Sequence, residues 1–165
     1  MLSYKKSLEI LKKTNALLEG HFILSSGRRS GQYIQCAQLL SKPHIASSLC
    51  KSLANKIKKN KKKIDLILSP AMGGLIIGYE IGKILKKETI FSERVNGKFT
   101  LRRNFSIRRN SNVLLVEDVI TTGKSIIECA KLITKSKAKI AGYACIIDRS
   151  NGKSKIKKKL SLKLK

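Results

Sequence analysis

Two neighbouring acids and a hydroxyl-rich loop are the residues of this sequence best suited to chemistry. The apolar run Val113–Val116 leads into Glu117 and Asp118, and the segment from Thr121 to Ser125 then supplies hydroxyls and free backbone N–H groups. Unpaired N–H groups at a helix start favour a phosphate, whereas adjacent carboxylates suit the vicinal hydroxyls of a ribose and a magnesium ion with its waters. The spacing therefore predicts a site for a phosphorylated ribose.

An alternation of helices and strands must position these residues. Apolar periodicity and breaker residues predict helices over 3–18, 43–59, 75–86 and 125–133, and strands over 64–68, 89–91, 113–116 and 140–147. This rhythm is typical of an α/β fold with a parallel sheet, in which ligands bind beyond the carboxyl ends of the strands. Three segments fall there: 69–74, 117–125 and 148–149.

The loop has two simpler interpretations. Gly123, Lys124 and Ser125 match the end of a Walker A loop, but Asp118 stands where that loop needs its first glycine. The second is an ordinary strand-to-helix turn capped by a hydroxyl, which any α/β protein can contain. The paired acids favour a ligand site over both.

Residues 113–125 resemble the phosphoribosyl pyrophosphate (PRPP) motif of the type I phosphoribosyltransferases: an apolar strand, two acids, two apolar residues and Thr-Thr-Gly-Lys-Ser. Four other segments resemble the orotate phosphoribosyltransferases in particular: 17–33, 69–74, 78–80 and 146–149. The resemblance therefore covers about residues 8–152. The resemblance implies the type I phosphoribosyltransferase fold, α/β with a central, mostly parallel sheet flanked by helices and a flexible hood. It also implies transfer of a phosphoribosyl group from PRPP to orotate, in the synthesis of pyrimidine nucleotides (UMP).

A single domain over 1–165 is expected, and its parts differ in character. The resemblance implies an N-terminal helix and base-side hood over 1–40 and a mobile catalytic loop over 92–112 that closes over a neighbouring subunit's site, hence a homodimer. From composition alone, 92–105 is an exposed basic hairpin. The basic tail over 153–165 is either a strand protected by lysines or disordered.

The resemblance assigns roles residue by residue. The expected catalytic residues are Glu117, Asp118, Arg94 and Lys98. PRPP contacts are expected from Met72, Gly73, Arg102, Arg103, Glu117, Asp118, Val119, Ile120, Thr121, Thr122, Gly123, Lys124 and Ser125. Orotate contacts are expected from Thr121 and Arg149, because a carboxylated pyrimidine suits a hydroxyl and an arginine fork. Asp148 and Arg149 also fit a surface ion pair. Mg²⁺ is the expected cofactor, held mainly by the substrate and through water to Asp118.

At three places this chain lacks a cation or a histidine that many members of the family have. The loop over 92–112 has no histidine, Ser25 stands where many relatives have lysine, and Met72-Gly73 replaces Tyr-Lys. Arg94, Lys98, Arg102 and Arg103 would then have to supply the charge that pyrophosphate needs.

Composition narrows the partners. Thirty-six Lys and Arg against ten Asp and Glu give a net charge of +26, which raises the possibility of nucleic-acid binding. The excess is mostly lysine, Trp is absent and no known nucleic-acid motif stands out, so we expect a solvated basic surface, with neither nucleic acid nor membrane as partner. Four cysteines without metal-site spacing are expected to be reduced core residues in a cytoplasmic enzyme.

Two alternative functions stay open on the sequence. One is a phosphoribosyltransferase that acts on a purine base. The other is a non-catalytic regulator that binds nucleotides or RNA through the same fold.

Overall fold

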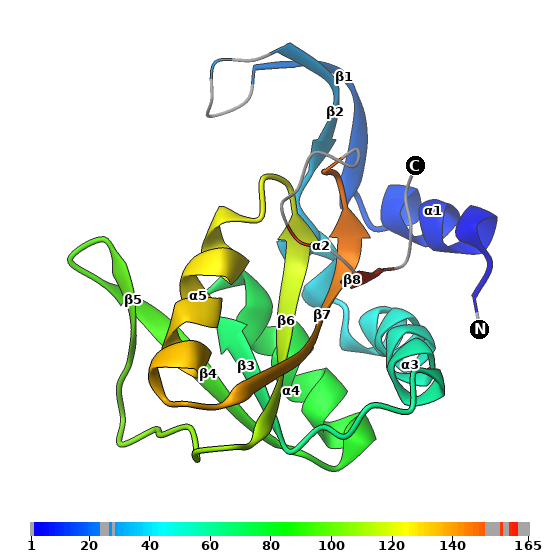
Figure 1. The fold of residues 1–165 in the computed structure, drawn as a ribbon. Coiled ribbons are helices and arrows are strands. Elements are labelled where there is room, and N and C mark those ends of the chain that lie inside the picture. Colours follow the sequence, from blue (N-terminus) through cyan, green and yellow to red (C-terminus); the bar gives the residue numbers. More distant parts are fainter. Residues whose placement is uncertain (1, 24–26, 28, 151–155, 157–158, 162–165) are drawn as a thin grey trace.

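A six-stranded sheet with helices on both faces forms the body of the molecule, and a two-stranded hairpin projects from it (Figure 1). The computed structural model describes residues 2–23, 27, 29–150, 156 and 159–161. The sheet has the order β5-β4-β3-β6-β7-β8. Its strands are β3 (Leu66–Pro70), β4 (Glu88–Val95), β5 (Lys98–Leu101), β6 (Asn112–Ile120), β7 (Lys139–Asp148) and β8 (Lys159–Ser161).

All neighbouring strands of this sheet pair in parallel except β4 and β5, which form an antiparallel hairpin. The predicted α/β fold with a mostly parallel sheet is thus confirmed. Parallel neighbours require crossover connections, and helices supply them: α4 (Gly73–Leu85) joins β3 to β4, and α5 (Lys124–Lys135) joins β6 to β7.

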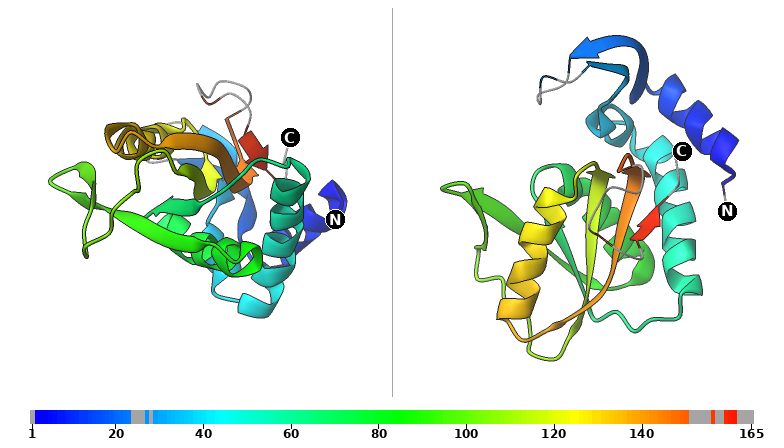
Figure 2. Two further views of the ribbon diagram at one scale, coloured as in Figure 1. Left: turned by 60° about the horizontal axis from the view of Figure 1, so that its bottom comes forward. Right: turned by 45° about the horizontal axis from the view of Figure 1, so that its top comes forward.

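Alternate residues of the central strands enter two separate cores. Ile67 and Leu114 pack with α4 and with α3 (Pro43–Lys59) on one face. Leu68 and Leu115 pack with α5 on the other face. Successive side chains of a strand point to opposite faces, so a strand buried on both faces reads as a continuous apolar run. Figure 2 shows the helices on the two sides of the sheet.

The N-terminal region corrects one prediction. Helix α1 spans Tyr4–Lys13, not 3–18, because the chain turns at Asn15, whose φ is 57°. Leu17 and Leu18 then begin β1 (Leu17–Ile23), which pairs antiparallel with β2 (Arg29–Ile34). This hairpin is the projecting part of the expected hood. Its predicted flexibility stays a prediction, and 24–26 and 28 lie outside the described residues.

Other element bounds shift by a few residues. A short helix that was not predicted, α2 (Cys36–Leu40), follows the hood, whereas α3 has the predicted bounds. The predicted 69–74 turn is shorter, since β3 runs to Pro70 and α4 begins at Gly73. Strands β4 and β6 are longer than predicted, and β6 continues four residues past Val116.

Two expectations about the remaining chain can be compared with the structure. All four cysteines are buried and none forms a disulfide, which confirms them as core residues; their reduced state stays a prediction. In the described part of the tail, 159–161 form β8 beside β7, so the strand alternative holds there. None of the described helices combines the length and apolar character needed to cross a bilayer.

Candidate active site

The acid pair lies inside strand β6, beside a gap in the sheet. Pairing of β3 with β6 ends at Leu68 and Leu115, while β6 continues along β7 as far as Ile120. Glu117 and Asp118 therefore have a strand neighbour on one side only. The start of helix α4 lies on the other side, so the acids border the point where the sheet opens.

Two glycines let helix α4 approach these carboxylates. A Cβ on Gly73 would lie 2.9 Å from Asp118 Oδ1, and one on Gly74 would lie 2.8 Å from the carbonyl oxygen of Val116 and 3.2 Å from Glu117 Oε1. Only glycine leaves room for this approach. The predicted pyrophosphate turn and the predicted ribose acids are thus brought together.

Glu117 is the more enclosed of the two acids. Its side chain is buried, whereas Asp118 is partly exposed and accepts a hydrogen bond of 2.7 Å from the Val119 N–H. Burial, with the neighbouring charge of Asp118, raises the pKa of Glu117 to about 9. The burial of Glu117 thus favours its neutral, protonated form in the ligand-free protein.

The predicted phosphate loop, residues 121–125, borders a small open pocket of about 60 Å³. Gly123 has φ 77°, which turns the chain into α5, and no side chain caps the helix. The Lys124 N–H donates to Thr122 Oγ1 at 3.3 Å, and the following first-turn N–H groups have no intrahelical acceptors. Lining residues include Glu117, every residue from Val119 to Ser125, and Ile126. The predicted phosphate segment is thus assembled around one pocket, directly after the acids.

The turn before α4 is fastened to the neighbouring strand. The Ala71 N–H donates to the Ser92 carbonyl oxygen at 2.8 Å, and the Ala71–Met72 peptide bond is cis. Met72 is 82% exposed and its side chain carries no charge, so this turn offers backbone and not a cation to a ligand.

The predicted catalytic loop begins as a regular hairpin, β4 and β5, with its turn at Asn96 and Gly97. Three of its cations are paired with acids. Arg94 donates to Glu128 Oε2 at 2.9 Å, Arg103 donates to Glu93 Oε1 through Nε at 3.0 Å and NH2 at 2.8 Å, and Arg102 NH1 lies 3.6 Å from Glu93 Oε2. Lys98 is exposed at the tip. Mobility of 92–112 stays a prediction.

Sequence reasoning missed the two acids that hold these arginines. Glu93 directly precedes Arg94 in the strand, and Glu128 lies one helical turn after Lys124. An acid at either position is common on solvated surfaces, so the residue type alone carried little signal.

The base side joins β7 to the hood. The Arg149 N–H donates to the Ile120 carbonyl oxygen at 2.8 Å, which places Arg149 beside Thr121 as predicted. Arg149 NH2 also donates to Ser30 Oγ and to the Gln32 carbonyl oxygen, each at 3.3 Å. Ser30 and Gln32 belong to β2, so the hood contacts the predicted orotate arginine directly.

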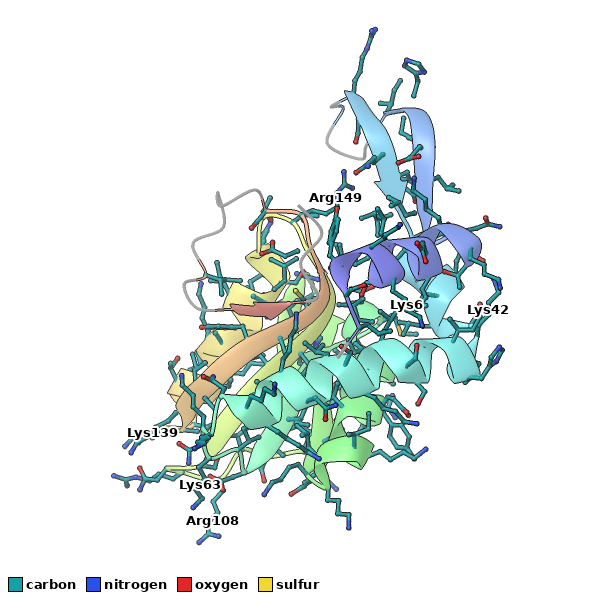
Figure 3. The ribbon with its side chains drawn as sticks, turned by 90° about the vertical axis from the view of Figure 1, so that its right-hand side faces the viewer. Lys6, Lys42, Lys63, Arg108, Lys139 and Arg149 are labelled. Atoms are coloured by element: carbon teal, nitrogen blue, oxygen red, sulfur yellow. The ribbon has the colours of Figure 1, made fainter. Side chains whose placement is uncertain are left out.

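Other cations lie far from this site. Lys63, Arg108 and Lys139 gather at the opposite end of the molecule from Arg149 (Figure 3). All three are exposed, as expected of a solvated basic surface, and they border the amino ends of the parallel strands. The described residues hold no cluster of three or more His, Cys, Asp or Glu that could bind a metal.

Comparisons with known proteins agree with this geometry. The sequence profile of the phosphoribosyl transferase domain matches residues 36–163. An orotate phosphoribosyltransferase of Chlorobium phaeobacteroides (strain DSM 266) is 46% identical over 149 residues, 90% of this chain and 76% of the relative. That of Parvibaculum lavamentivorans is 45% identical over 160 residues, 96% of this chain and 82% of the relative. This chain belongs to the orotate phosphoribosyltransferase family.

Solved structures extend the likeness to the fold. The crystal structure of orotate phosphoribosyltransferase from Aeropyrum pernix has a TM-score of 0.80 at 25% identity, covering 94% of this chain and 91% of that one. An adenine phosphoribosyltransferase from Thermoanaerobacter pseudethanolicus has a TM-score of 0.71 at 15% identity, covering 94% and 98%. The second match shows a shared fold alone.

Proposed function

We propose that this member of the family transfers the phosphoribosyl group of PRPP to orotate and releases orotidine 5'-monophosphate and pyrophosphate. The single observation that carries the proposal is the shared pocket at the end of β6. Glu117 and residues 119–126 line this pocket, and Gly73 at the start of α4 lies close to Asp118 beside it.

Each part of the pocket meets one part of PRPP. Glu117 and Asp118 accept hydrogen bonds from the ribose hydroxyls, and the segment from Thr121 to Ser125 binds the 5'-phosphate through hydroxyls and helix-start N–H groups. The turn at Met72 and Gly73 meets the pyrophosphate. Positive charge on the ribose ring develops as pyrophosphate leaves, so the nearby carboxylate of Asp118 stabilises the transition state.

The hairpin supplies the cations that the turn lacks. Arg94, Lys98, Arg102 and Arg103 neutralise the leaving pyrophosphate, and the acids beside them fix where the arginine groups lie. Closure of this segment would also exclude water from the activated ribose.

On the base side, Thr121 and Arg149 bind orotate. An arginine fork suits the carboxylate of orotate, and the hood contact through Ser30 orients that fork. If orotate enters with its attacking ring nitrogen already deprotonated, the reaction needs no general base from the protein.

Mg²⁺ belongs to the proposal as a cofactor. Carboxylate oxygens are the ligands that Mg²⁺ prefers, and Asp118 is partly exposed, so it can hold the ion through water while substrate oxygens provide most of the coordination. When bound, the ion supplies charge neutralisation on the pyrophosphate.

A homodimer is also part of the proposal. Met72, Ile76 and Tyr79 are 82%, 53% and 67% exposed and follow helical spacing at the start of α4. A second copy would bury this apolar stripe next to the pyrophosphate turn, within reach of a neighbour's hairpin tip. Cytoplasmic location stays a prediction from the sequence.

A panel of bases tests the proposed reaction. Pyrophosphate release from PRPP is measured with orotate, uracil, adenine, guanine and xanthine, and we expect turnover with orotate alone. Preference for adenine, guanine or xanthine would instead indicate a purine phosphoribosyltransferase. A tight RNA complex without turnover on any base would favour the regulator.

The acid pair is tested separately by Asp118→Asn, which keeps the side-chain volume and removes the charge. We expect turnover to fall about 100-fold, with an unchanged circular dichroism spectrum. Glu88→Gln, which removes an exposed acid at the far end of β4, is the matched control. Wild-type turnover in Asp118→Asn would contradict the role of the pair.

A further inference from the structure

Two contacts fasten strand β4 to helix α5 of the same chain. Ser92 Oγ and Cys129 Sγ lie 3.2 Å apart, and Arg94 NH2 donates to Glu128 Oε2 at 2.9 Å. Ser92 and Arg94 are two residues apart in the strand, so their side chains project from the same face of the sheet. The hairpin therefore leans on the helix whose start forms the phosphate loop.

The guanidinium group of Arg94 is fixed from several sides. NH2 bonds Glu128, NH1 donates to the Gly97 carbonyl oxygen, and the group lies 4.1 Å from the centroid of the Phe99 ring. A guanidinium has five N–H donors, so these two bonds leave part of the fork for an anion. A charge-assisted bond and an aromatic face together hold it in one orientation.

This fixed guanidinium lies near the proposed site of its own chain. Ser92, two residues before Arg94, accepts the hydrogen bond from Ala71 in the pyrophosphate turn. Cys129, the α5 residue that contacts Ser92, is buried, and this burial raises the pKa of its thiol to about 12. Glu128 and Cys129, which contact Arg94 and Ser92, are neighbouring residues of α5, the helix that begins at the phosphate loop.

We infer that Glu128 is a positioning residue that holds Arg94 at the pyrophosphate position of its own subunit's site. The inference rests on the proposed function and divides the hairpin into two parts. Arg94 is tied to α5 of its own chain, whereas Lys98, at the exposed tip, is the cation placed to reach a neighbouring site. Glu128 acts through the orientation of Arg94 and does not touch the substrate.

A double-variant cycle tests whether Glu128 works through Arg94. Turnover of orotate is compared among wild type, Glu128→Gln, Arg94→Ala and the double variant, with Glu88→Gln as the control for loss of an exposed acid. We expect kcat to fall about tenfold in Glu128→Gln and about 100-fold in Arg94→Ala, with KM for orotate little changed. The double variant should match Arg94→Ala, because Glu128 then has nothing to position. Losses that multiply in the double variant would overturn the inference.

Mixed oligomers test which site Arg94 serves. Subunits carrying Asp118→Asn are combined with subunits carrying Arg94→Ala. If Arg94 serves its own chain, every site keeps one defect and activity does not recover. If it served the neighbour, one site of each mixed dimer would regain both groups, and recovery of activity would overturn the inference.

A third measurement does not depend on turnover. In ligand-free protein, we expect trypsin to cleave after Lys98 several-fold faster in Glu128→Gln than in wild type or Glu88→Gln, because the hairpin loses its tie to α5. Equal cleavage rates would overturn the inference. A wild-type chain inactive on every base would instead contradict the proposed function, and the cleavage rates would still report on Glu128.

Discussion

The phosphate loop and the β4–β5 hairpin both face anionic groups in the proposed reaction, but they are built differently. The loop from Thr121 to Ser125 uses hydroxyls and helix-start N–H groups around a pocket. The hairpin uses long cationic side chains, and its arginines are already bonded to Glu93 and Glu128. The loop therefore receives a phosphate through backbone and hydroxyl groups, whereas the hairpin receives an anion through guanidinium groups that neighbouring carboxylates hold in place.

This difference matches the fates of the two phosphate groups. The 5'-phosphate stays on the sugar throughout the reaction, so a rigid backbone site suits it. Pyrophosphate must be held in the transition state and then released. Arginines that stay bonded to carboxylates make that release easier, because each guanidinium keeps a partner after pyrophosphate has left.

The largest effect is expected where backbone geometry builds the site. Gly74→Ala places a Cβ 2.8 Å from the Val116 carbonyl oxygen, so α4 must shift away from the acids. We expect turnover to fall about 100-fold, because small displacements of a positioning element are costly. Gly142→Ala is the matched control, since its Cβ would meet only Leu114 at 3.7 Å. Similar activity in the two variants would contradict the rigid-backbone side of the comparison.

A smaller effect than that of Gly74→Ala or Arg94→Ala is expected of Arg103, because Arg102 shares its partner Glu93. Arg103→Ala removes both bonds to Glu93 and the contact of Arg103 with the Phe91 ring. We expect a loss of about 0.5–1 kcal/mol in the free energy of unfolding, measured by urea denaturation, and roughly tenfold lower turnover. Arg109→Ala, at an exposed position outside the hairpin, should change neither. If turnover fell as much in Arg103→Ala as in Gly74→Ala, the distinction between backbone-built and ion-paired parts of the site would be wrong.

Removing the buried acid should separate stability from activity. In ligand-free protein with EDTA, Glu117→Gln should raise the melting temperature, since the native state holds this carboxyl with a pKa of about 9 instead of 4.5. Between those pH values the folded state binds a proton that the unfolded state has lost, so wild-type stability falls as pH rises, by at most about 1.4 kcal/mol per pH unit.

The gain in melting temperature of Glu117→Gln over wild type should therefore grow from pH 5 to pH 8.5. Its turnover should be lower than that of the wild type. Calorimetric scans across this range measure the gain, with Glu88→Gln as the exposed-acid comparison. A gain that does not depend on pH would show that Glu117 is ionised in the folded state.

The smallest effect concerns the thiols. Burial raises the pKa of Cys50 and of Cys129 to about 12 each, so both should react slowly with iodoacetamide at pH 8 in the native state. Cys129 contacts Ser92 under the hairpin, whereas Cys50 lies in the core with α3 and α4. Mass spectrometry after timed labelling measures both rates. Faster labelling of Cys129 would show that the hairpin lifts while the rest stays folded.

The sequence predicted the elements that positive patterns mark. Helix α3 was found with its bounds because Pro43 begins it and a lysine-rich segment ends it. The acids and the phosphate loop were found because their types and spacing are unusual. The hood was missed as a hairpin because Leu17 and Leu18 continue the apolar pattern of α1, and only the left-handed turn at Asn15 separates the two.

Side-chain partners were beyond the reach of the sequence. Residues 92 to 94 and 128 to 129 lie more than 30 positions apart, and only the packing of β4 against α5 brings them together. The pairing of Glu93 with Arg102 and Arg103 likewise depends on the register of the hairpin, in which Glu93 lies opposite Thr100. Type and spacing located the chemistry, whereas tertiary contacts decide which cation is held by which acid.

The separation of the two cores has a consequence for how such enzymes diversify. Leu17 and Cys36, which flank the hood, pack with α3 and α4, whereas α5 and Phe99 of the hairpin share the opposite core. Substitutions that reshape base recognition can accumulate in one layer without repacking the layer under the sugar-phosphate pocket. A chimaera that takes residues 1–40 from a relative should therefore still bind PRPP through residues 117–125 of this chain.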